Sequence, residues 1–399
     1  MSKLVIALAV VGWMSCTAPA NAQEPPLAPA SPVVVGRGSG EVILADLDRD
    51  GHLDLLTRHL LDSSVAVRLG DGRGRFAAVA RSVTRFSYGP GAAALGDVDA
   101  DGMLDLVIAS RDGGSERIHI LLGNGQGGFD ERSGSMFVAS AAQRTYKPIL
   151  RLADVNEDGK LDVVTSNGQR NTLEILFGDG RGRLSRATVV VLGPSGGLYT
   201  MAVGDVDADG HLDVVAASSG WSGSGSGRVV IKRGDGRGGF TDMPGSPVTV
   251  DSAPRLVALA DVNGDERPDI VLAHSRRNRL SVLLGDRSGR FAPAPGSPLE
   301  VGLETWAVEV ADIDRDGSAD LVAAMVNGTA PHESRVAVLR GGTDRFVPAA
   351  GSPFPAGRGA YRLTVGDVNE DGKLDVVASS FEGDAVAVLL GRGPLVPRR

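Results

Sequence analysis

The chain has 399 residues, of which 55 are glycine and only 4% are aromatic, and its formal net charge is −8. The length alone would suggest two or three domains, and the negative charge argues against a nucleic-acid partner. The only cysteine is Cys16, so no disulfide can brace the fold.

Residues 1–22 have the pattern of a secretory signal peptide. Lys3 precedes an apolar stretch from Leu4 to Trp13, and Ala20-Asn21-Ala22 matches a cleavage site. The apolar stretch is too short to span a membrane, and no other segment of the sequence is a candidate. We therefore expect a secreted protein, extracellular or periplasmic, without a transmembrane segment.

Seven copies of a nine-residue acidic loop follow, and their first aspartates are 51, 57, 51, 56, 51 and 55 residues apart. Such a period indicates one repeated supersecondary unit that cannot bury its apolar face alone. Positions 1, 3 and 5 are Asp or Asn, position 2 is apolar and position 9 is Asp. The loops span 46–54, 97–105, 154–162, 205–213, 261–269, 312–320 and 367–375.

The composition of these loops fits a hard cation, because Ca²⁺ takes six to eight oxygen ligands, mostly carboxylates and backbone carbonyls. Alternate side chains on a tight loop converge on one point, and Gly at position 6 permits the turn that brings position 9 back. Position 7 would offer its backbone carbonyl, which leaves its side chain free to vary. The alternative is that Asp-Gly only marks solvated turns. We expect up to seven Ca²⁺ ions, with these ligands: Asp46, Asp48, Asp50, His52, Asp54, Asp97, Asp99, Asp101, Met103, Asp105, Asp154, Asn156, Asp158, Lys160, Asp162, Asp205, Asp207, Asp209, His211, Asp213, Asp261, Asn263, Asp265, Arg267, Asp269, Asp312, Asp314, Asp316, Ser318, Asp320, Asp367, Asn369, Asp371, Lys373 and Asp375.

The fifth loop departs from the pattern, since Glu266 replaces the Gly at position 6. A non-glycine residue is strained where φ must be positive, so we expect this site to be the weakest. The ligand positions hold 25 of the 49 acidic residues. Seven bound Ca²⁺ would add fourteen charges to the formal −8 and give about +6.

Each repeat contains four short β-type runs, as in the second repeat at 92–98, 104–110, 117–123 and 129–140. The residue before every acidic loop is Ala or Gly, which suits strands that crowd toward a common axis. Seven such repeats without helical periodicity predict an all-β fold, a seven-bladed β-propeller of four-stranded blades. These small residues are Ala45, Gly96, Ala153, Gly204, Ala260, Ala311 and Gly366.

The two ends of the chain predict how the ring closes. The last repeat stops after its third run, at 386–391, whereas residues 27–36 resemble the fourth-run segment 292–302. We expect the N-terminal strand to complete the last blade and so remove two open sheet edges. Residues 23–399 then form one domain, which we expect to be a monomer.

The repeats resemble the FG-GAP/VCBS repeat family, whose best-known members are the N-terminal propellers of integrin α subunits. The resemblance covers almost all of 27–399 and rests on the DxDxDGxxDL loops, on the small residue before them and on GDGRGRF-type turns at 70–76, 178–184 and 234–240. It implies a propeller with Ca²⁺ between the first two strands of a blade. Integrin propellers carry the loop in only some blades. The full set is more like bacterial and fungal secreted members, among which are lectins.

Aromatic and cationic residues gather where the strand order places the face away from the acidic loops. Tyr199, Trp306 and Tyr361 each precede a loop's first Asp by six residues, Arg255 takes the same place in its repeat, and Trp221 lies in a Gly/Ser-rich stretch. Such residues make good contacts with partners. The alternative is that they only fill gaps between blades. We expect Tyr199, Trp221, Arg255, Trp306 and Tyr361 to bind the partner.

No nucleophile motif, zinc spacing or phosphate-binding loop is present in the sequence. We therefore expect a recognition or scaffold module for an extracellular protein or glycan. A carbohydrate-binding lectin is one alternative. The other is a polysaccharide lyase, which would need a general base beside a cation that stabilises an enolate. We expect His59, His274 and His332 on the face away from the acidic loops, where such a base would lie.

Overall fold

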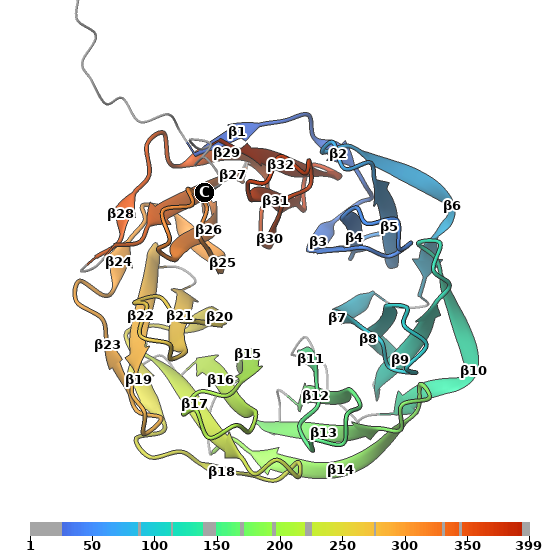
Figure 1. Ribbon diagram of the computed structural model, residues 1–399, viewed down its shortest axis with the longest axis horizontal. Coiled ribbons are helices and arrows are strands. Elements are labelled where there is room, and N and C mark those ends of the chain that lie inside the picture. The colour runs from blue at the N-terminus through green and yellow to red at the C-terminus, as the bar shows by residue number, and fades with distance from the viewer. Residues whose placement is uncertain are drawn as a thin grey trace, which may run out of the picture.

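A computed structural model describes residues 26–86, 89–112, 115–138, 149–167, 171–193, 197–219, 226–274, 277–328, 332–342 and 345–392. The regular structure of these segments is all β, with strands arranged in antiparallel sheets around a central axis (Figure 1). None of them contains a helix long and apolar enough to cross a membrane. The expected signal peptide, Tyr88, Tyr146 and Trp221 lie outside the described residues.

Seven sheets form the ring, and each is one blade whose strands run in order from the axis outward. The first three blades are β3 (Ser39–Ala45), β4 (Asp54–His59), β5 (Ser64–Gly70) and β6 (Phe76–Arg85); β7 (Pro90–Gly96), β8 (Asp105–Asp112), β9 (Ser115–Gly123) and β10 (Phe129–Val138); and β11 (Leu150–Ala153), β12 (Asp162–Asn167), β13 (Thr172–Gly178) and β14 (Leu184–Val191).

In the other four blades the outermost strand is split into two short pieces. These blades are β15 (Leu198–Gly204), β16 (Asp213–Ser219), β17 (Gly227–Gly234), β18 (Phe240–Asp242) and β19 (Val248–Val250); β20 (Pro254–Ala260), β21 (Asp269–His274), β22 (Arg279–Gly285), β23 (Phe291–Pro293) and β24 (Leu299–Glu300); β25 (Glu304–Ala311), β26 (Asp320–Val326), β27 (Glu333–Arg340), β28 (Val347–Pro348) and β29 (Phe354–Arg358); and β30 (Leu363–Gly366), β31 (Asp375–Ser380) and β32 (Ala385–Gly391) with β1 (Leu27–Pro29) and β2 (Val33–Val34).

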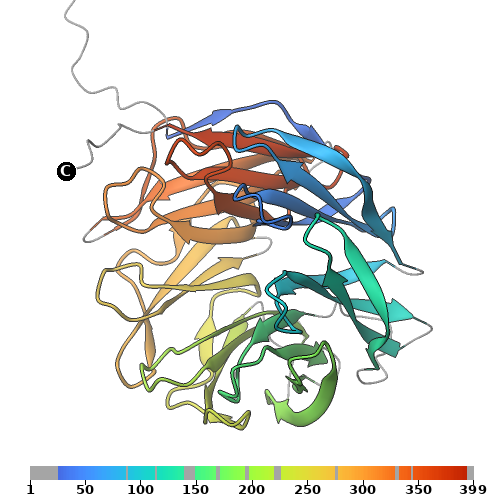
Figure 2. The same cartoon turned by 45° about the vertical axis from the view of Figure 1, so that its right-hand side comes forward.

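The hydrophobic core lies between blades rather than within them. Seven clusters of buried residues are found, and each joins one pair of neighbouring blades, including the last and the first. Figure 2 shows the blades standing side by side around the ring. The apolar residue at position 2 of every acidic loop is buried in one of these clusters, as expected: Leu47, Val98, Val155, Val206, Val262, Ile313 and Val368.

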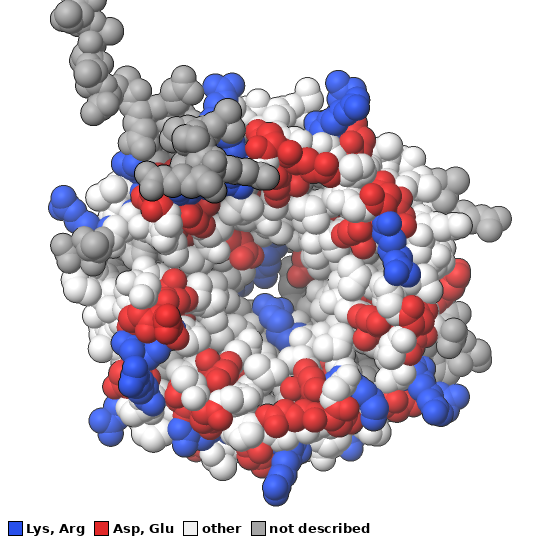
Figure 3. Space-filling view, in the orientation of Figure 1, with Lys and Arg blue, Asp and Glu red and all other residues white. Residues whose placement is uncertain are grey.

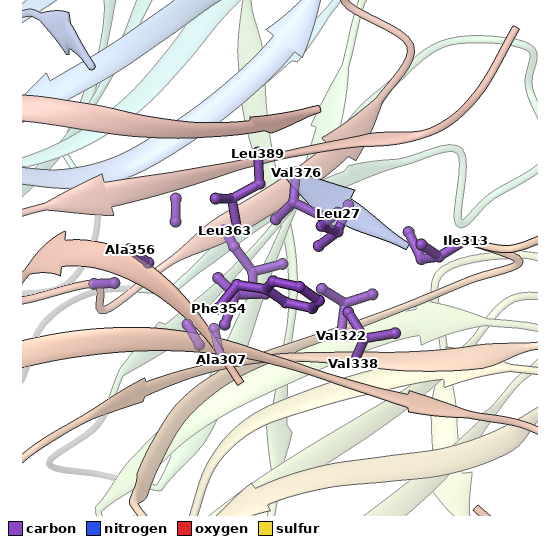
Figure 4. Packing of buried hydrophobic residues seen from close by; sticks show 14 of the residues in the cluster. Leu27, Ala307, Ile313, Val322, Val338, Phe354, Ala356, Leu363, Val376 and Leu389 are labelled. Atoms are coloured by element: carbon purple, nitrogen blue, oxygen red, sulfur yellow. The ribbon is translucent and has the colours of Figure 1, made fainter. Parts of the chain in front are cut away.

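The N-terminal segment completes the last blade, which confirms the expected closure. β1 and β2 both pair antiparallel with β32, at Leu27↔Gly391 and Val33↔Val386. Leu27 is only 2% exposed and belongs to the cluster between the sixth and seventh blades. In Figure 4 it lies beside Val376 and Ile313. One cluster is thereby made from the two ends of the chain.

The small residues before the acidic loops sit where the innermost strands converge. A Cβ added at Gly96 would lie 2.6 Å from Leu161 of the next blade, and one at Gly366 would lie 2.9 Å from Leu53. The space beside the axis therefore limits the size of this residue. The seven-bladed propeller predicted from the repeats is the observed fold.

Candidate metal sites and the opposite face

The aspartate at position 9 of every loop is a structural brace. All seven are fully buried at the start of the second strand. One carboxylate oxygen accepts the backbone N–H of position 2 at 2.7–3.1 Å. The other accepts the backbone N–H of the glycine at the end of the third strand, or directly after it in the sixth blade, at 2.6–2.9 Å. Each of these side chains thus ties its loop to the neighbouring strand end.

Burial also makes these carboxyl groups harder to ionise. It raises the pKa of five of them to about 6, although the two backbone N–H donors lower it: Asp105, Asp162, Asp213, Asp320 and Asp375. The other acidic groups of each loop raise it further. A bound cation would favour the charged form.

The glycine that ends each third strand was missed in the sequence. A Cβ at any of the seven would lie 2.1–2.5 Å from the position 8 carbonyl oxygen of the loop. No other residue fits without moving the backbone. The available signal was one Gly closing the third run in every repeat: Gly70, Gly123, Gly178, Gly234, Gly285, Gly341 and Gly391.

Carboxylates converge at four of the seven loops. In the first loop, Asp46, Asp48 and Asp50 each place one oxygen within 4.8 Å of the others. Figure 3 shows acidic side chains spread around the ring. Three other loops form such groups: Asp97, Asp99 and Asp101; Asp205, Asp207 and Asp213; and Asp312, Asp314 and Asp316. The remaining loops have Asn at position 3, whose amide oxygen can be a ligand.

Two oxygens support the fit to a cation. Asp207 Oδ1 and Asp367 Oδ1 are buried and find no hydrogen-bond partner among the described residues. A buried carboxylate oxygen without a partner is costly, and a bound metal ion would remove that cost. The atoms that these loops offer as metal ligands are all oxygens, which hard cations prefer. Several of the loops could therefore hold a metal ion.

Basic side chains already contact some of these carboxylates. Arg233 donates to Asp207 in the fourth loop, and Arg267 donates to Asp265 in the fifth. Arg340 Nη1 lies 3.5 Å from Asp314 Oδ2 in the sixth. The contacts differ from loop to loop although the loop sequences are alike. They would compete with a cation, so the sites are not equivalent.

The fifth loop shows how Glu266 is accommodated. Glu266 has φ 64°, so it takes the positive-φ conformation that glycine supplies in the other loops. Position 4 is also left-handed in every loop, and here it is Gly264, with φ 75°. The other six loops have a non-glycine residue there, with φ 55–65°. The fifth loop thus exchanges the two positions and, like the others, keeps one non-glycine residue in the left-handed region.

In two blades the side chain at position 7 of the loop contacts a neighbouring blade. His52 of the first loop contacts Glu370 at position 4 of the seventh loop. His211 Nδ1 lies 2.5 Å from Glu157 Oε1 at the same place between the third and fourth loops. Hydrogen bonding to these carboxylates raises the pKa of both histidines. The expectation that this side chain varies freely is therefore too broad, because these two link neighbouring blades.

On the face away from the loops, four of the expected partner-binding residues form a stacked arc: Tyr199, Arg255, Trp306 and Tyr361. Each comes from a different one of the last four blades. The Arg255 guanidinium carbon lies 5.5 Å from the ring centroid of Tyr199 and 4.4 Å from that of Trp306. The rings of Trp306 and Tyr361 are 4.5 Å apart, tilted by 60°. All four are partly exposed.

β-Bulges place three members of the arc. In the pairing of first and second strands, the register skips Tyr199 between Leu198 and Thr200, and the same skip occurs at Arg255 and Trp306. A bulge re-aims the side chain of the unpaired residue. Trp306 Nε1 is buried and has no hydrogen-bond partner among the described atoms. The arc therefore packs between blades and also remains open to solvent.

Two of the three histidines expected on this face are buried, whereas His332 is partly exposed and contacts Glu382. His59 and His274 are 2% and 1% exposed. His274 is held by Ser252 O at 3.0 Å and Ser281 Oγ at 2.7 Å. Burial lowers the pKa of both, for His59 to about 4. They are core residues, which corrects the expectation that they face solvent there.

Solved structures of other proteins share this architecture. One is BBS1N, crystallised in complex with ARL6DN. The superposition covers 92% of this chain and 98% of BBS1N, with a TM-score of 0.58 and 12% sequence identity. A second is a lectin of Agrocybe aegerita that recognises non-reducing terminal N-acetylglucosamine. The superposition covers 84% of this chain and 88% of the lectin, with a TM-score of 0.52 and 18% identity. For a protein from Lactobacillus plantarum, the superposition covers 92% of this chain and 94% of that protein, with a TM-score of 0.56 and 14% identity. These likenesses show the fold alone. The search of curated proteins finds no match.

A family model matches the repeats directly. The model for the FG-GAP-like repeat matches residues 46–108, 97–165, 154–216, 207–272 and 261–323. Each match runs from one acidic loop through the next, and the fourth begins at position 3 of its first loop. Together these matches cover more than half of the chain. The chain therefore belongs to the FG-GAP-like repeat family.

Proposed function

We propose that this protein is a secreted, calcium-binding β-propeller that recognises an extracellular glycan or protein through the stacked arc. The observation that carries the proposal is the arc itself, in which aromatic and cationic side chains of four blades meet and stay partly exposed. Trp, Tyr and Arg dominate the energetics of interfaces. Aromatic ring faces also suit the apolar faces of sugars.

Calcium would act on the other face of the ring. The loop carboxylates, such as Asp46, Asp48 and Asp50, would hold it. The ion would supply positive charge that offsets the repulsion among these groups. The pattern of residues 1–22 supports secretion, and calcium outside the cytoplasm is abundant enough to fill even weak sites.

The structural neighbours support two kinds of partner. The Agrocybe aegerita lectin recognises a terminal sugar, which favours a glycan. BBS1N was crystallised with ARL6DN, which favours a protein as the second candidate. Lyase activity remains the third and would need a base other than the buried His59 and His274.

A screen of glycans and polysaccharides, carried out with calcium, would test the function. Saturable binding of a neutral sugar without turnover identifies a lectin, whereas release of unsaturated products identifies a lyase. The screen should be repeated with Trp306→Ala, because the proposal places the ligand on the arc. A ligand that binds both proteins equally well would show that the arc is not the recognition surface.

A further inference from the structure

The middle of the ring is open, and charged side chains lie inside it (Figure 3). The innermost strands supply most of them. Arg151 and Glu309 both lie three residues before an acidic loop, a row whose other members are small or uncharged: Ile43, Ala94, Ala202, Ala258 and Thr364. Glu41 and Arg362 lie five residues before a loop. These residues come from four blades, yet their charges act on one another across the ring: Glu41 and Glu309 on Arg151, Arg151 and Arg362 on Glu309, and Glu41 and Arg151 on Arg362.

The pairing of these charges is uneven. Arg58, on β4, donates to Glu41 Oε2 at 3.0 Å, so these two compensate each other. Arg151 bonds only to the carbonyl of Leu150, at 2.8 Å. No carboxylate within 4.0 Å of Arg151 is found in the described part of the chain.

Arg362 is similarly placed. Its Nη1 donates to the carbonyl of Tyr361 at 3.0 Å and lies 3.5 Å from that of Trp306. It too has no ion pair with a described carboxylate. The backbone carbonyls of Tyr361 and Trp306, two members of the arc, thus hold this guanidinium group in place. Among the described residues, neither Arg151 nor Arg362 has an ion pair with a carboxylate in the central channel, the open middle of the ring.

The charges in the channel act on one another. Burial lowers the pKa of Arg362; the negative charge of Glu41 raises it, and the positive charges of Arg58, Arg151 and Arg255 lower it further. Burial also raises the pKa of Glu309 to about 7, against the effect of Arg151 and Arg362. Arg151 and Arg362 therefore share the centre of the ring with Glu41, which pairs with Arg58, and with Glu309, which is only partly ionised at neutral pH. Low-dielectric walls strengthen this excess of positive charge.

We infer that the central channel binds an oxyanion, the carboxylate or sulfate group of a ligand, through the guanidinium groups of Arg151 and Arg362. Guanidinium is the side chain best suited to such groups, because its planar N–H donors match two oxygens at once. A bound anion would neutralise charges that the protein leaves uncompensated. The inference is independent of the proposed function, since it does not require a ligand on the arc.

Calorimetric titration of the calcium-loaded protein with sodium sulfate, at constant ionic strength, tests the site. Sulfate stays fully ionised across the useful pH range. Arg151→Gln and Arg362→Gln should each weaken binding about tenfold or more, as expected for a charge-assisted hydrogen bond. Arg73→Gln is the matched control, because Arg73 is exposed in the turn after β5, and it should bind like the parent.

Glu309→Gln should act in the opposite direction. Removing this negative charge should tighten sulfate binding several-fold. In the parent, affinity should rise as the pH falls through about 7, because Glu309 becomes neutral while Arg58, Arg151, Arg255 and Arg362 stay charged. In Glu309→Gln the affinity should not change over that range. This variant keeps the shape of the side chain and the arginines, so it tests the site even if an arginine variant does not fold.

A second titration decides whether the anion is free or part of a sugar. Glucuronate is compared with glucose, which has the same ring without the carboxylate. Glucuronate binding that depends on Arg151 and Arg362, with no binding of glucose, assigns the channel to acidic glycans. Sulfate binding without glucuronate binding assigns it to free anions. The inference is overturned if the parent shows no saturable sulfate binding, or if the Arg151→Gln/Arg362→Gln double variant binds sulfate equally well while melting like the parent.

Discussion

The two faces of the ring follow opposite rules. On the loop face, the same residue types recur in every blade. They include the buried aspartate at position 9 and the glycine whose backbone N–H donates a hydrogen bond to it. On the opposite face, the residue six positions before each loop changes from blade to blade in the described part of the chain: Gly40, Gly91, Tyr199, Arg255, Trp306 and Tyr361. What is repeated builds the fold. What departs from the repeat marks where this chain differs from a generic propeller, and its distinctive chemistry gathers over the later blades.

Removing calcium should have the largest effect, because it acts on all repeats at once. If each site binds with a dissociation constant of about 0.1 mM, about 1 mM Ca²⁺ stabilises each by roughly 1.4 kcal/mol. Seven such sites would approach about 10 kcal/mol, comparable to the stability of a whole domain. Calorimetry should show a melting temperature many degrees lower in chelator. A protein shown by metal analysis to be calcium-loaded, with a melt that EDTA leaves unchanged, would contradict this.

Opening the ring should be the next largest perturbation. Deleting residues 23–36 removes β1 and β2, exposes the edge of β32 and takes Leu27 from its cluster. We expect aggregation or a clear loss of stability, measured by size-exclusion chromatography and thermal melting.

A matched pair of point variants sharpens the same prediction. Leu27→Ala should cost about 2–5 kcal/mol, as for a buried leucine. Val34→Ala, in the same segment, should be nearly neutral because Val34 is 71% exposed. If both variants and the deletion melt like the parent, the N-terminal segment does not stabilise the ring.

Substitutions in the arc should separate recognition from packing. Trp306→Ala and Tyr361→Ala should abolish ligand binding. A fully buried aromatic costs about 3–5 kcal/mol, and these two should cost less because they are partly exposed. Val191→Ala is a control, because Val191 is 60% exposed on the outermost strand β14. A lowered melting temperature with binding retained by the folded fraction would show that the arc is structural.

Trp221→Ala is the third variant of this series. Trp221 lies outside the described residues, in a Gly/Ser-rich stretch that predicts little packing. We expect lost binding with an unchanged melting temperature. Unchanged binding would remove Trp221 from the predicted recognition surface while leaving the four members of the arc.

The sequence predicts the repeated half of the molecule far better than the unrepeated half. Seven registered loops predict the blade number, the buried position 2 residues and the closing strand. Contacts between blades could not be predicted, because they depend on which loops become neighbours in the ring. His52 meets Glu370 only because the chain closes. Arg151 and Arg362 likewise come together through closure, and their only signal was a positive charge on a first strand, in rows that are otherwise mostly uncharged.

The smallest expected effect concerns the fifth loop. Glu266→Gly should relieve the left-handed conformation of Glu266, tighten calcium there and stabilise the domain by up to about 1 kcal/mol. Gly264→Ala is the matched control. It places a non-glycine residue in the left-handed region at φ 75°, so by the same reasoning it should destabilise by up to about 1 kcal/mol, although Ala100 and Ala208 occupy position 4 at φ 60° in other loops. Arg267 contacts Asp265 in both variants and should keep the site weaker than the first loop, where no basic contact to Asp46, Asp48 or Asp50 is found among the described residues. Calcium titrations followed by loop-specific NMR signals would rank the sites. Tighter binding at 261–269 than at 205–213 in the parent would show that Glu266 adopts the turn without strain or adds a ligand.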